Sequence, residues 1–430
     1  MKRVIWNALD AAARADALAR PTQRRDERLV GAVRAIIEDV RDGGWDALVR
    51  QAERLDGAAP RLVETAGPAA AARQALTPEQ VDAIELAARN ISAFHDGSGP
   101  REHAVETQPG LTLRKVWRPI DWVGLYVPGG KTPLFSTLLM LALPARAAGV
   151  GEIVVVTPPT AEGLDPLIAL AAELCGIDAV WTVGGAQAIA ALAFGAGPIP
   201  RVDKICGPGN AWVSEAKTQV AALSGGPAID MPAGPSELMV IADSGGDPAT
   251  VAADLLSQAE HDADAQVMLV TPDAALAEAV LAAVTRQVAD LPRRALAHAA
   301  LAGGKVIVVD SLEEAYEVAN LYAPEHLSLA LADADAAVPL IRNAGAVFSG
   351  YGAAETFGDY LAGSSHVLPT DGAARAWSGV SVHTFLRAMT VQSVSCEAAR
   401  RLAEPAALLA RLEGLEAHAR AADIRLGAFA

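Results

Sequence analysis

The sequence predicts an α/β protein with two modules, each built on a mainly parallel sheet. From residue 122 onward, short runs rich in β-branched residues alternate with alanine-rich segments of helical spacing, as expected for βαβ units. The turn-rich segment Ile229–Ser236 interrupts this alternation and separates the two modules. Residues 1–100 differ, because their apolar positions recur at helical spacing without a strong strand pattern.

The elements follow in order along the chain. Helices are expected at 27–40 and 79–94, followed by an extended run at 111–116. The first module should contain the strands 122–127, 152–157, 179–183 and 202–206 and the helices 133–148, 165–175, 186–194 and 210–223. The second should contain the strands 237–242, 266–271, 305–309, 326–330 and 346–349 and the helices 248–261, 274–289 and 313–320. The tail from residue 395 onward is expected to be helical.

The bulk composition indicates a globular protein that handles small molecules. Its 430 residues are too many for one core, and 52% are hydrophobic while 20% are charged. The net charge of −16 argues against nucleic acid or an anionic membrane surface as a partner. The apolar stretch Thr132–Ala145 is too short to span a membrane, and the first residues do not form a signal peptide. Three scattered cysteines suggest a reducing, cytoplasmic setting.

Gln258 and His261 are a candidate half of a metal site. Their three-residue spacing, near the end of the helix that Asp247-Pro248 opens, puts both side chains on one helix face. Further ligands must come from elsewhere, and the candidates are Asp359 and His418. Two imidazoles and two oxygens suit a borderline divalent ion such as zinc, manganese or cobalt. The alternative is that both residues only decorate a helix end, where a histidine is ordinarily favourable.

Glu325 and His326 are a candidate acid–base pair. His326 begins a run that looks like a strand, and adjacent strand residues point to opposite sides. A shared task therefore requires a strand end or a bend, where both can face a cleft. Histidine serves naturally as a general base. The alternative is a half-buried histidine beside a solvated glutamate.

Three glycine-rich turns from strand to helix suggest a nucleotide at the carboxyl ends of the first module's strands. They are Gly207–Asn210, Gly184–Gln187 and Gly124–Thr132. No GxGxxG fingerprint occurs, and in the last turn the lysine falls one residue too late for a phosphate-binding P-loop. Turn chemistry alone also explains each of them. Cys206, beside the first turn, is interpreted as a packing residue and not as a nucleophile.

In this order and spacing, the motifs of the chain resemble the histidinol dehydrogenase family. The matching segments are Gly124–Gly130, Gly185–Leu192, Gly207–Ala211, Asp230–Glu237, Ser257–His261, Tyr322–Leu327, Gly358–Tyr360, His366–Thr370 and Glu413 to His418. The resemblance implies NAD-dependent oxidation of L-histidinol through L-histidinal to L-histidine, with two NAD, in the final steps of histidine biosynthesis. Ser364-Ser365 stand where the family usually has an asparagine before the histidine, and an alternative is another small polyol or amino alcohol as substrate.

The resemblance also assigns roles to residues. It implies one Zn²⁺ per subunit, held by Gln258, His261, Asp359 and His418, with His418 supplied by the other subunit of a homodimer. Glu325 and His326 correspond to the acid–base pair. The substrate contacts would be Ser236, Gln258, His261, His326, Asp359, His366, Glu413 and His418. The NAD contacts would be Tyr126, Gln187 and Asn210.

The fold implied by the resemblance has two incomplete Rossmann-like, aldehyde-dehydrogenase-like modules, with small N- and C-terminal helical segments exchanged in a dimer. An N-terminal segment would cover residues 1–21. Residues 22–125 with 236–380 would form the domain that carries the metal and catalytic residues, and residues 126–235 the NAD-binding domain. Residues 381–430 would form a helical tail that contributes to the partner subunit's site.

Overall fold

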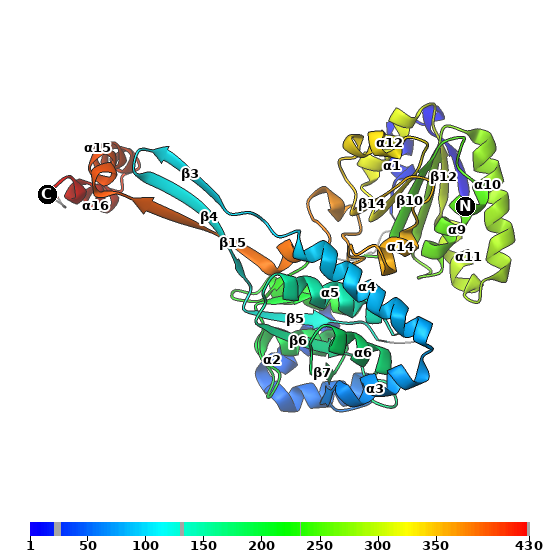
Figure 1. The fold of residues 1–430 in the computed structure, drawn as a ribbon, viewed down its shortest axis with the longest axis horizontal. Helices are drawn as coiled ribbons and strands as arrows, with labels where there is room; N and C mark the ends of the chain where they lie inside the picture. Colours follow the sequence, from blue (N-terminus) through cyan, green and yellow to red (C-terminus); the bar gives the residue numbers. More distant parts are fainter. Residues whose placement is uncertain (21–26, 130–132, 233, 428–430) are drawn as a thin grey trace. The chain divides into compact units, whose positions relative to one another are not determined.

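The computed structural model describes residues 1–20, 27–129, 133–232 and 234–427 and divides into two units. The first unit contains Met1–Ser98 and Asp121–Phe385, and the second contains Gly99–Ile120 and Leu386–Ala430. Two six-stranded sheets with their helices make up the first unit (Figure 1), and a three-stranded sheet with two helices makes up the second. Within the described ranges, no helix is both long enough and apolar enough to cross a membrane.

One six-stranded sheet confirms the strands predicted for the first module. Its order is β2 (Arg61–Glu64), β7 (Ala179–Thr182), β6 (Glu152–Thr157), β5 (Trp122–Tyr126), β8 (Lys204–Cys206) and β9 (Ala228–Ile229). All neighbours pair in parallel except β2, which runs antiparallel to β7. Along the chain, β6 and β7 are added on one side of β5, whereas β8 and β9 are added on its other side. The strand order therefore reverses between β5 and β8, and α/β folds usually bind ligands at such a point.

The helices of this module follow the predicted pattern. They are α5 (Phe135–Ala147), α6 (Pro166–Leu174), α7 (Gly185–Phe194) and α8 (Ala211–Ala221). Almost every residue of α7 is buried, which its continuous apolar sequence anticipates.

The other six-stranded sheet is parallel throughout. Its order is β1 (Lys2–Ile5), β12 (Lys305–Val308), β11 (Gln266–Thr271), β10 (Glu237–Ala242), β13 (His326–Ala330) and β14 (Ala346–Ser349). Its helices include α9 (Pro248–Ala259), α10 (Ala274–Gln287), α11 (Arg294–Gly303), α12 (Leu312–Tyr322) and α14 (Glu355–Tyr360). Strand β1 was not predicted, because four residues with only Val4 buried give no recognisable strand pattern.

The N-terminal helices pack on the first module, whereas the family resemblance implied a domain of residues 22–125 with residues 236–380. The apolar face of α2 (Glu27–Leu55) belongs to the same buried cluster as residues of β6, α7 and α8. Helices α3 (Ala66–Ala75) and α4 (Pro78–Asp96) pack on α6 and α5. An amphipathic pattern shows that a helix has a buried face but not which sheet covers it, and this explains the difference.

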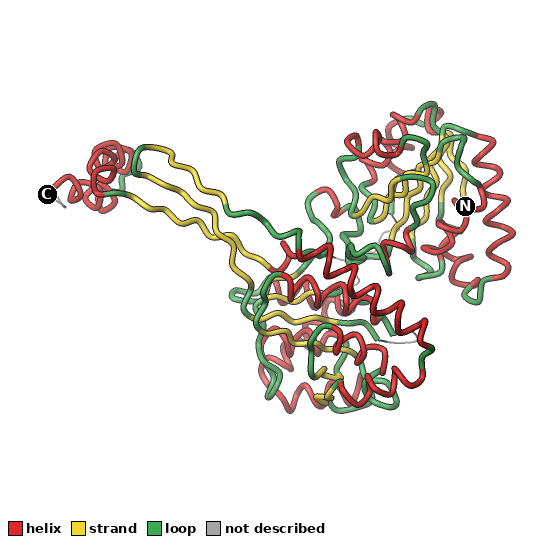
Figure 2. Tube along the Cα trace, viewed as in Figure 1, coloured by secondary structure: helices red, strands yellow, loops and turns green. Residues whose placement is uncertain are grey.

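The second unit is built around an antiparallel sheet in the order β15 (Leu386–Val394), β4 (Leu111–Pro119) and β3 (His103–Gln108). Strand β4 confirms the extended run predicted at 111–116. Helices α15 (Cys396–Leu412) and α16 (Glu416–Gly427) follow β15 and confirm the helical tail, and within this unit the strands run side by side to the helix pair (Figure 2). The amide of Ser395 donates to the carbonyl of Gly110 at 2.8 Å, which joins the start of α15 to the β3–β4 turn.

Candidate active site

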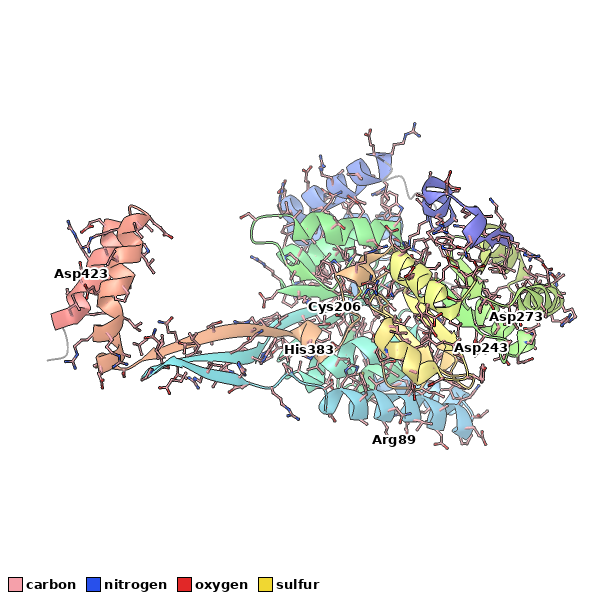
Figure 3. All side chains as sticks on the ribbon, turned by 90° about the horizontal axis from the view of Figure 1, so that it is seen from above. Arg89, Cys206, Asp243, Asp273, His383 and Asp423 are labelled. Carbon is pink, nitrogen blue, oxygen red and sulfur yellow. The ribbon has the colours of Figure 1, made fainter. Side chains whose placement is uncertain are left out.

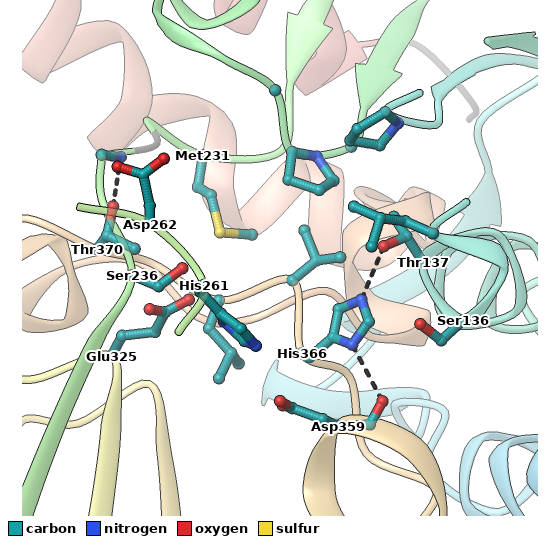
Figure 4. Close-up of a pocket in the computed structure, with 18 of the residues that line it drawn as sticks. Ser136, Thr137, Met231, Ser236, His261, Asp262, Glu325, Asp359, His366 and Thr370 are labelled. Atoms are coloured by element: carbon teal, nitrogen blue, oxygen red, sulfur yellow. Dashed lines mark hydrogen bonds between the residues drawn. The ribbon is translucent and has the colours of Figure 1, made fainter. Parts of the chain in front are cut away.

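One cavity of about 480 Å³ in the first unit brings together residues from both modules. It lies at the carboxyl end of β8 in one sheet and at the amino ends of β10 and β13 in the other. Its lining includes seven residues that the sequence analysis singled out: Asn210, Ser236, His261, Glu325, His326, Asp359 and His366. Figure 4 shows Ser236, Glu325 and His261 among the residues that line the cavity, and His366 between Thr137 and Asp359, its two hydrogen-bond partners.

His326 is the first residue of β13, so the strand end that a shared role with Glu325 requires is present. Two residues before Glu325, Ala323 ends α12 in the left-handed conformation (φ 56°), and Pro324 follows it. This bend lets both side chains face the cavity although they are adjacent in sequence.

The imidazole of His326 is buried and held in one tautomer. Nδ1 lies 3.1 Å from the carbonyl oxygen of Glu237, which can only accept, so Nδ1 carries the proton. Nε2 has no hydrogen-bond partner among the described residues and lies 3.7 Å from Oδ1 of Asp359. Burial lowers the pKa of His326 to about 3, so the ring is neutral with a free Nε2 lone pair. The ring stacks on Phe348 at 5.8 Å between centroids.

The carboxyl group of Glu325 is also fixed by Glu237. Oε2 of Glu325 accepts the backbone N–H of Glu237 at 2.8 Å and lies 3.6 Å from Nδ1 of His326. Burial raises the pKa of Glu325 well above its usual range, and the N–H of Glu237 only partly opposes this effect. Glu237 therefore contacts both members of the pair through its backbone.

Gln258 and His261 lie together as their spacing predicts. Gln258 is in the last turn of α9, and its Nε2 lies 3.3 Å from Nδ1 of His261. The side-chain oxygen of Gln258 is buried and has no hydrogen-bond partner among the described residues. His261 lines the cavity together with Asp359, which lies on α14. An unpartnered amide oxygen, an imidazole and a carboxylate are donors that suit a borderline divalent cation such as zinc.

Glu355 belongs to this site but was not predicted from the sequence. It precedes Asp359 by one helical turn on α14, and ligand atoms of His326, Glu355 and Asp359 all lie within 4.8 Å of one another. Both carboxylate oxygens of Glu355 are buried without a hydrogen-bond partner in the described residues. Burial raises the pKa of Asp359 to about 7 and that of Glu355 well above its usual range. The four-residue spacing of Glu355 and Asp359 on a short helix was the available signal.

His366 is fixed at both ring nitrogens. Its Nδ1 donates to the carbonyl oxygen of Asp359 at 3.1 Å, so Nε2 accepts from the hydroxyl of Thr137 at 2.9 Å. Burial lowers the pKa of His366 to about 4 and keeps the ring neutral. The residue before it, Ser365, is buried and accepts the N–H of Val367 at 3.1 Å.

The turn Gly207–Asn210 forms part of the cavity wall. Gly207 has φ 127°, and a Cβ there would lie 2.0 Å from the carbonyl oxygen of Tyr126, so only glycine fits. The buried Lys217 donates to the carbonyl of Gly207 at 2.8 Å and pairs with Asp230, whose Oδ2 accepts the N–H of Gly207 at 2.6 Å. The side chain of Asn210 caps α8 by accepting the N–H groups of Trp212 and Val213.

The turn Gly184–Gln187 is held by the carboxylate of Asp56, the residue that follows α2. Asp56 accepts the N–H of Gly184 at 2.9 Å and the side-chain amide of Gln187 at 3.0 Å. Gln187 is fully buried, and the hydroxyl of Tyr126 accepts the N–H of Gly185 at 3.3 Å. In the third glycine-rich turn, Gly130, Lys131 and Thr132 lie outside the described residues.

Glu413 and His418 lie in the second unit. Glu413 ends α15 and His418 is in α16, and both side chains are exposed there. Cys206, which is labelled in Figure 3, is the last residue of β8 and is completely buried. Burial raises the pKa of its thiol, as expected for a packing residue.

Comparison with known proteins identifies the family. The family model described as histidinol dehydrogenase matches residues 18–426. The chain is 49% identical over 429 residues to histidinol dehydrogenase from Xylella fastidiosa (strain 9a5c), covering 99% of both chains. It is 44% identical over 427 residues to that from Vibrio parahaemolyticus serotype O3:K6, covering 99% of this chain and 98% of the relative. The chain belongs to the histidinol dehydrogenase family.

A solved structure of the same family agrees along the whole chain. The crystal structure of histidinol dehydrogenase from Elizabethkingia anophelis matches with a TM-score of 0.94 and 39% identity, over 99% of this chain and 98% of that chain. Membership of the histidinol dehydrogenase family makes the chain an oxidoreductase, as the motifs predicted.

Proposed function

We propose that this enzyme uses zinc and NAD to oxidise L-histidinol through L-histidinal to L-histidine, consuming two NAD per substrate in the final steps of histidine biosynthesis. Family membership supports the substrate. The observation that carries the chemistry is the buried His326, whose free Nε2 faces the cavity beside Glu325.

His326 is the proposed general base in both oxidations. Its Nδ1–H is held by the carbonyl of Glu237, so the neutral ring offers Nε2 to the substrate hydroxyl. Removal of that proton lets the carbon release hydride to NAD and become the aldehyde. As water adds to the aldehyde, Nε2 would return this proton to the carbonyl oxygen. The same nitrogen then takes a proton from the hydrate while the second hydride leaves for a second NAD.

Glu325 is the proposed base for the addition of water to the aldehyde. Its burial raises its pKa, so its carboxylate form is a stronger base than an exposed glutamate. It lies 3.6 Å from His326, close enough for both groups to act on one carbon of the bound substrate. No covalent enzyme intermediate is required, in agreement with the burial of Cys206.

Gln258, His261 and Asp359 from one subunit and His418 from its partner are proposed to hold one Zn²⁺. Zinc would supply a positive charge that binds the substrate's nitrogen atoms and orients its alcohol carbon. The orphaned oxygen of Gln258 and the neighbouring imidazole of His261 support this ligand set. Proposed substrate contacts from the protein are these four residues with Ser236, His326, His366 and Glu413.

NAD is proposed to bind near the glycine turns of the first module, with Tyr126, Gln187 and Asn210 as its contacts. Asn210 lines the cavity, and the turn Gly207–Asn210 lies at the carboxyl end of β8, where α/β folds usually bind ligands. Tyr126 and Gln187 are buried beside the Gly184-Gly185 turn, so NAD would reach both side chains at this turn.

The active form is proposed to be a cytoplasmic homodimer in which the terminal segments are exchanged. Helix α15 supports this proposal, because Leu408, Leu409 and Leu412 are 57%, 65% and 78% exposed on it. The free thiols of the chain, two of them buried, support a reducing compartment.

The stoichiometry of NADH formation tests the reaction. The zinc-loaded protein should form two NADH for each histidinol and release histidine. One NADH per histidinol would mean that the reaction stops at the aldehyde. No NADH from histidinol, with activity toward a member of a panel of small polyols and amino alcohols, would favour the alternative substrate class that Ser364-Ser365 leave open.

A further inference from the structure

We propose that Arg20 is a positioning residue for the active site: it clamps Glu237, whose backbone orients both Glu325 and His326. The effect on turnover rests on the function proposed above, whereas the effect on the backbone of Glu237 does not. Arg20 touches none of the reacting groups, so it would act only through Glu237.

Glu237 is the residue on which the acid–base pair depends. Its N–H binds the carboxyl group of Glu325 at 2.8 Å, and its carbonyl oxygen binds Nδ1 of His326 at 3.1 Å. These two bonds use the backbone donor and the backbone acceptor of one residue at the start of β10. A small rotation of this backbone would therefore change the direction of both side chains together.

The side chain of Glu237 is held by a two-point ion pair. Nε and one terminal nitrogen of Arg20 donate to its two carboxylate oxygens at 2.5 and 2.8 Å. The backbone N–H of Asp371 donates to the same carboxylate at 2.9 Å. The side chain of Glu237 is 2% exposed, so loss of Arg20 would leave a buried carboxylate without its counter-charge.

Arg20 also holds the chain that leads into Glu325. The same terminal nitrogen donates to the carbonyl oxygens of Tyr322 and Ala323 at 2.9 and 3.3 Å. The guanidinium lies over the ring of Tyr322, 3.8 Å from its centroid. Arg20 therefore links the start of β10 to the bend before β13, the two elements that carry the contacts described above.

Arginine is required at this position because the arrangement uses a planar fork. Two donors match the two oxygens of Glu237, while the flat face stacks on Tyr322. A lysine would retain the charge but provide neither the two-point contact nor the stacking. Lysine at position 20 should therefore restore only part of the function.

The test compares Arg20→Gln and Arg20→Lys with wild type and with Arg3→Gln as a matched control. Arg3 lies in the same N-terminal segment and forms an exposed ion pair with Glu278 at 2.6 Å. We expect Arg20→Gln to lower kcat by roughly 10- to 100-fold, with KM for histidinol and NAD changed less than about threefold. Arg20→Lys should fall between Arg20→Gln and wild type, and Arg3→Gln should match wild type.

Hydrogen–deuterium exchange of the peptide that contains Glu237 provides a second readout that needs no substrate. The amide of Glu237 should exchange faster in Arg20→Gln than in wild type, and at the wild-type rate in Arg3→Gln. Wild-type kcat in folded Arg20→Gln, or slower turnover with unchanged exchange at Glu237, would overturn the proposal; if Arg20→Gln does not fold, Arg20→Lys is judged by the same two results. If the wild-type protein does not oxidise histidinol but Arg20→Gln still exchanges faster at Glu237, the proposed function is wrong and the positioning role of Arg20 is retained.

Discussion

The carbonyl oxygen of Glu237 accepts a hydrogen bond from Nδ1 of His326, 3.1 Å away, and thereby leaves Nε2 of the buried ring unprotonated and without a partner among the described residues. A neutral imidazole with a free lone pair is the state that a general base needs. The hydrogen bond to Glu237 therefore fixes which nitrogen of the ring is available to accept a proton.

His326 is expected to transfer protons and not to bind the metal. His326→Ala should lower kcat by about 10²- to 10⁴-fold, the range typical of a lost general base, and retain its zinc. His261→Ala should lose zinc, because an imidazole ligand is removed. Metal content by mass spectrometry and steady-state kinetics check both variants, with the exposed His298→Ala as control. Loss of zinc from His326→Ala and Glu355→Gln, but not from His261→Ala, would instead place the metal among His326, Glu355 and Asp359.

Glu325 is expected to matter most after the first oxidation. Glu325→Gln keeps the shape of the side chain but cannot accept a proton from water, so conversion of histidinal to histidine should slow by at least roughly 100-fold. Oxidation of histidinol to the aldehyde should slow much less. Rapid-quench analysis of both steps measures this difference, and equal slowing of the two steps would contradict the assignment to water activation.

If His418 is supplied by the partner subunit, two inactive ligand variants should restore activity to each other in a mixed dimer. His418→Ala and Asp359→Asn should each have low zinc content and low activity. Mixed and reassembled in equal amounts, they should recover ~25% of wild-type activity, because half of the dimers are mixed and each contains one intact site. Mixtures without activity, in which mixed dimers are detected by native mass spectrometry, would show that one chain supplies all of its own ligands.

Gly207 should tolerate no side chain. A Cβ would lie 2.0 Å from the carbonyl oxygen of Tyr126 at a φ of 127°, so Gly207→Ala must displace β5 or the turn. We expect a loss of about 1–3 kcal/mol in the free energy of unfolding, with weaker NAD binding. Urea denaturation and NAD titration measure these effects. Gly67→Ala is the control, since its Cβ meets nothing within 4 Å on α3, and an equal effect in both variants would contradict the prediction.

His95 should make the protein less stable in mild acid. Its ring is 1% exposed with neither nitrogen hydrogen-bonded among the described residues, and burial lowers its pKa, opposed only in part by Asp96. Below the unfolded value of about 6.5 the unfolded chain binds a proton that the folded chain does not. The free energy of unfolding therefore falls with pH below about 6.5, by at most about 1.4 kcal/mol per pH unit from this group. Urea denaturation from pH 5 to 8 should show a shallower pH dependence for His95→Leu, and parallel curves for the two proteins would contradict this prediction.

Much of the first unit could be predicted because its strands are buried on both faces. Runs such as 152–157 and 266–271 are almost continuously apolar and are flanked by glycine turns or helix caps. The alternation of strands and helices could therefore be recognised from the sequence. The short edge strands β1 and β2 were not predicted, because neither has more than one buried residue and β-pairing partners are distant in sequence.

The site was predicted in parts. Gln258 and His261 follow from helical spacing, and Glu325-His326 from residue type beside a proline. Glu237 and Glu355 were missed, because their importance comes from contacts with residues that are distant in the sequence, such as Glu237 with Arg20. Such contacts produce no periodic pattern in the local sequence.

From the sequence alone we could predict the buried strands and their helices, the separation of the two modules near residue 234, and the short motifs that are candidates for proton transfer and ligand binding. These properties depend on side chains that are neighbours along the chain. Two features became known only from the folded chain: α2 packs on the first module, and the carboxyl end of β8 meets the amino ends of β10 and β13 at one cavity. Folding also decided that Glu325 and His326 share a strand end held by Glu237, because burial, tautomer and pKa depend on groups that only folding brings together.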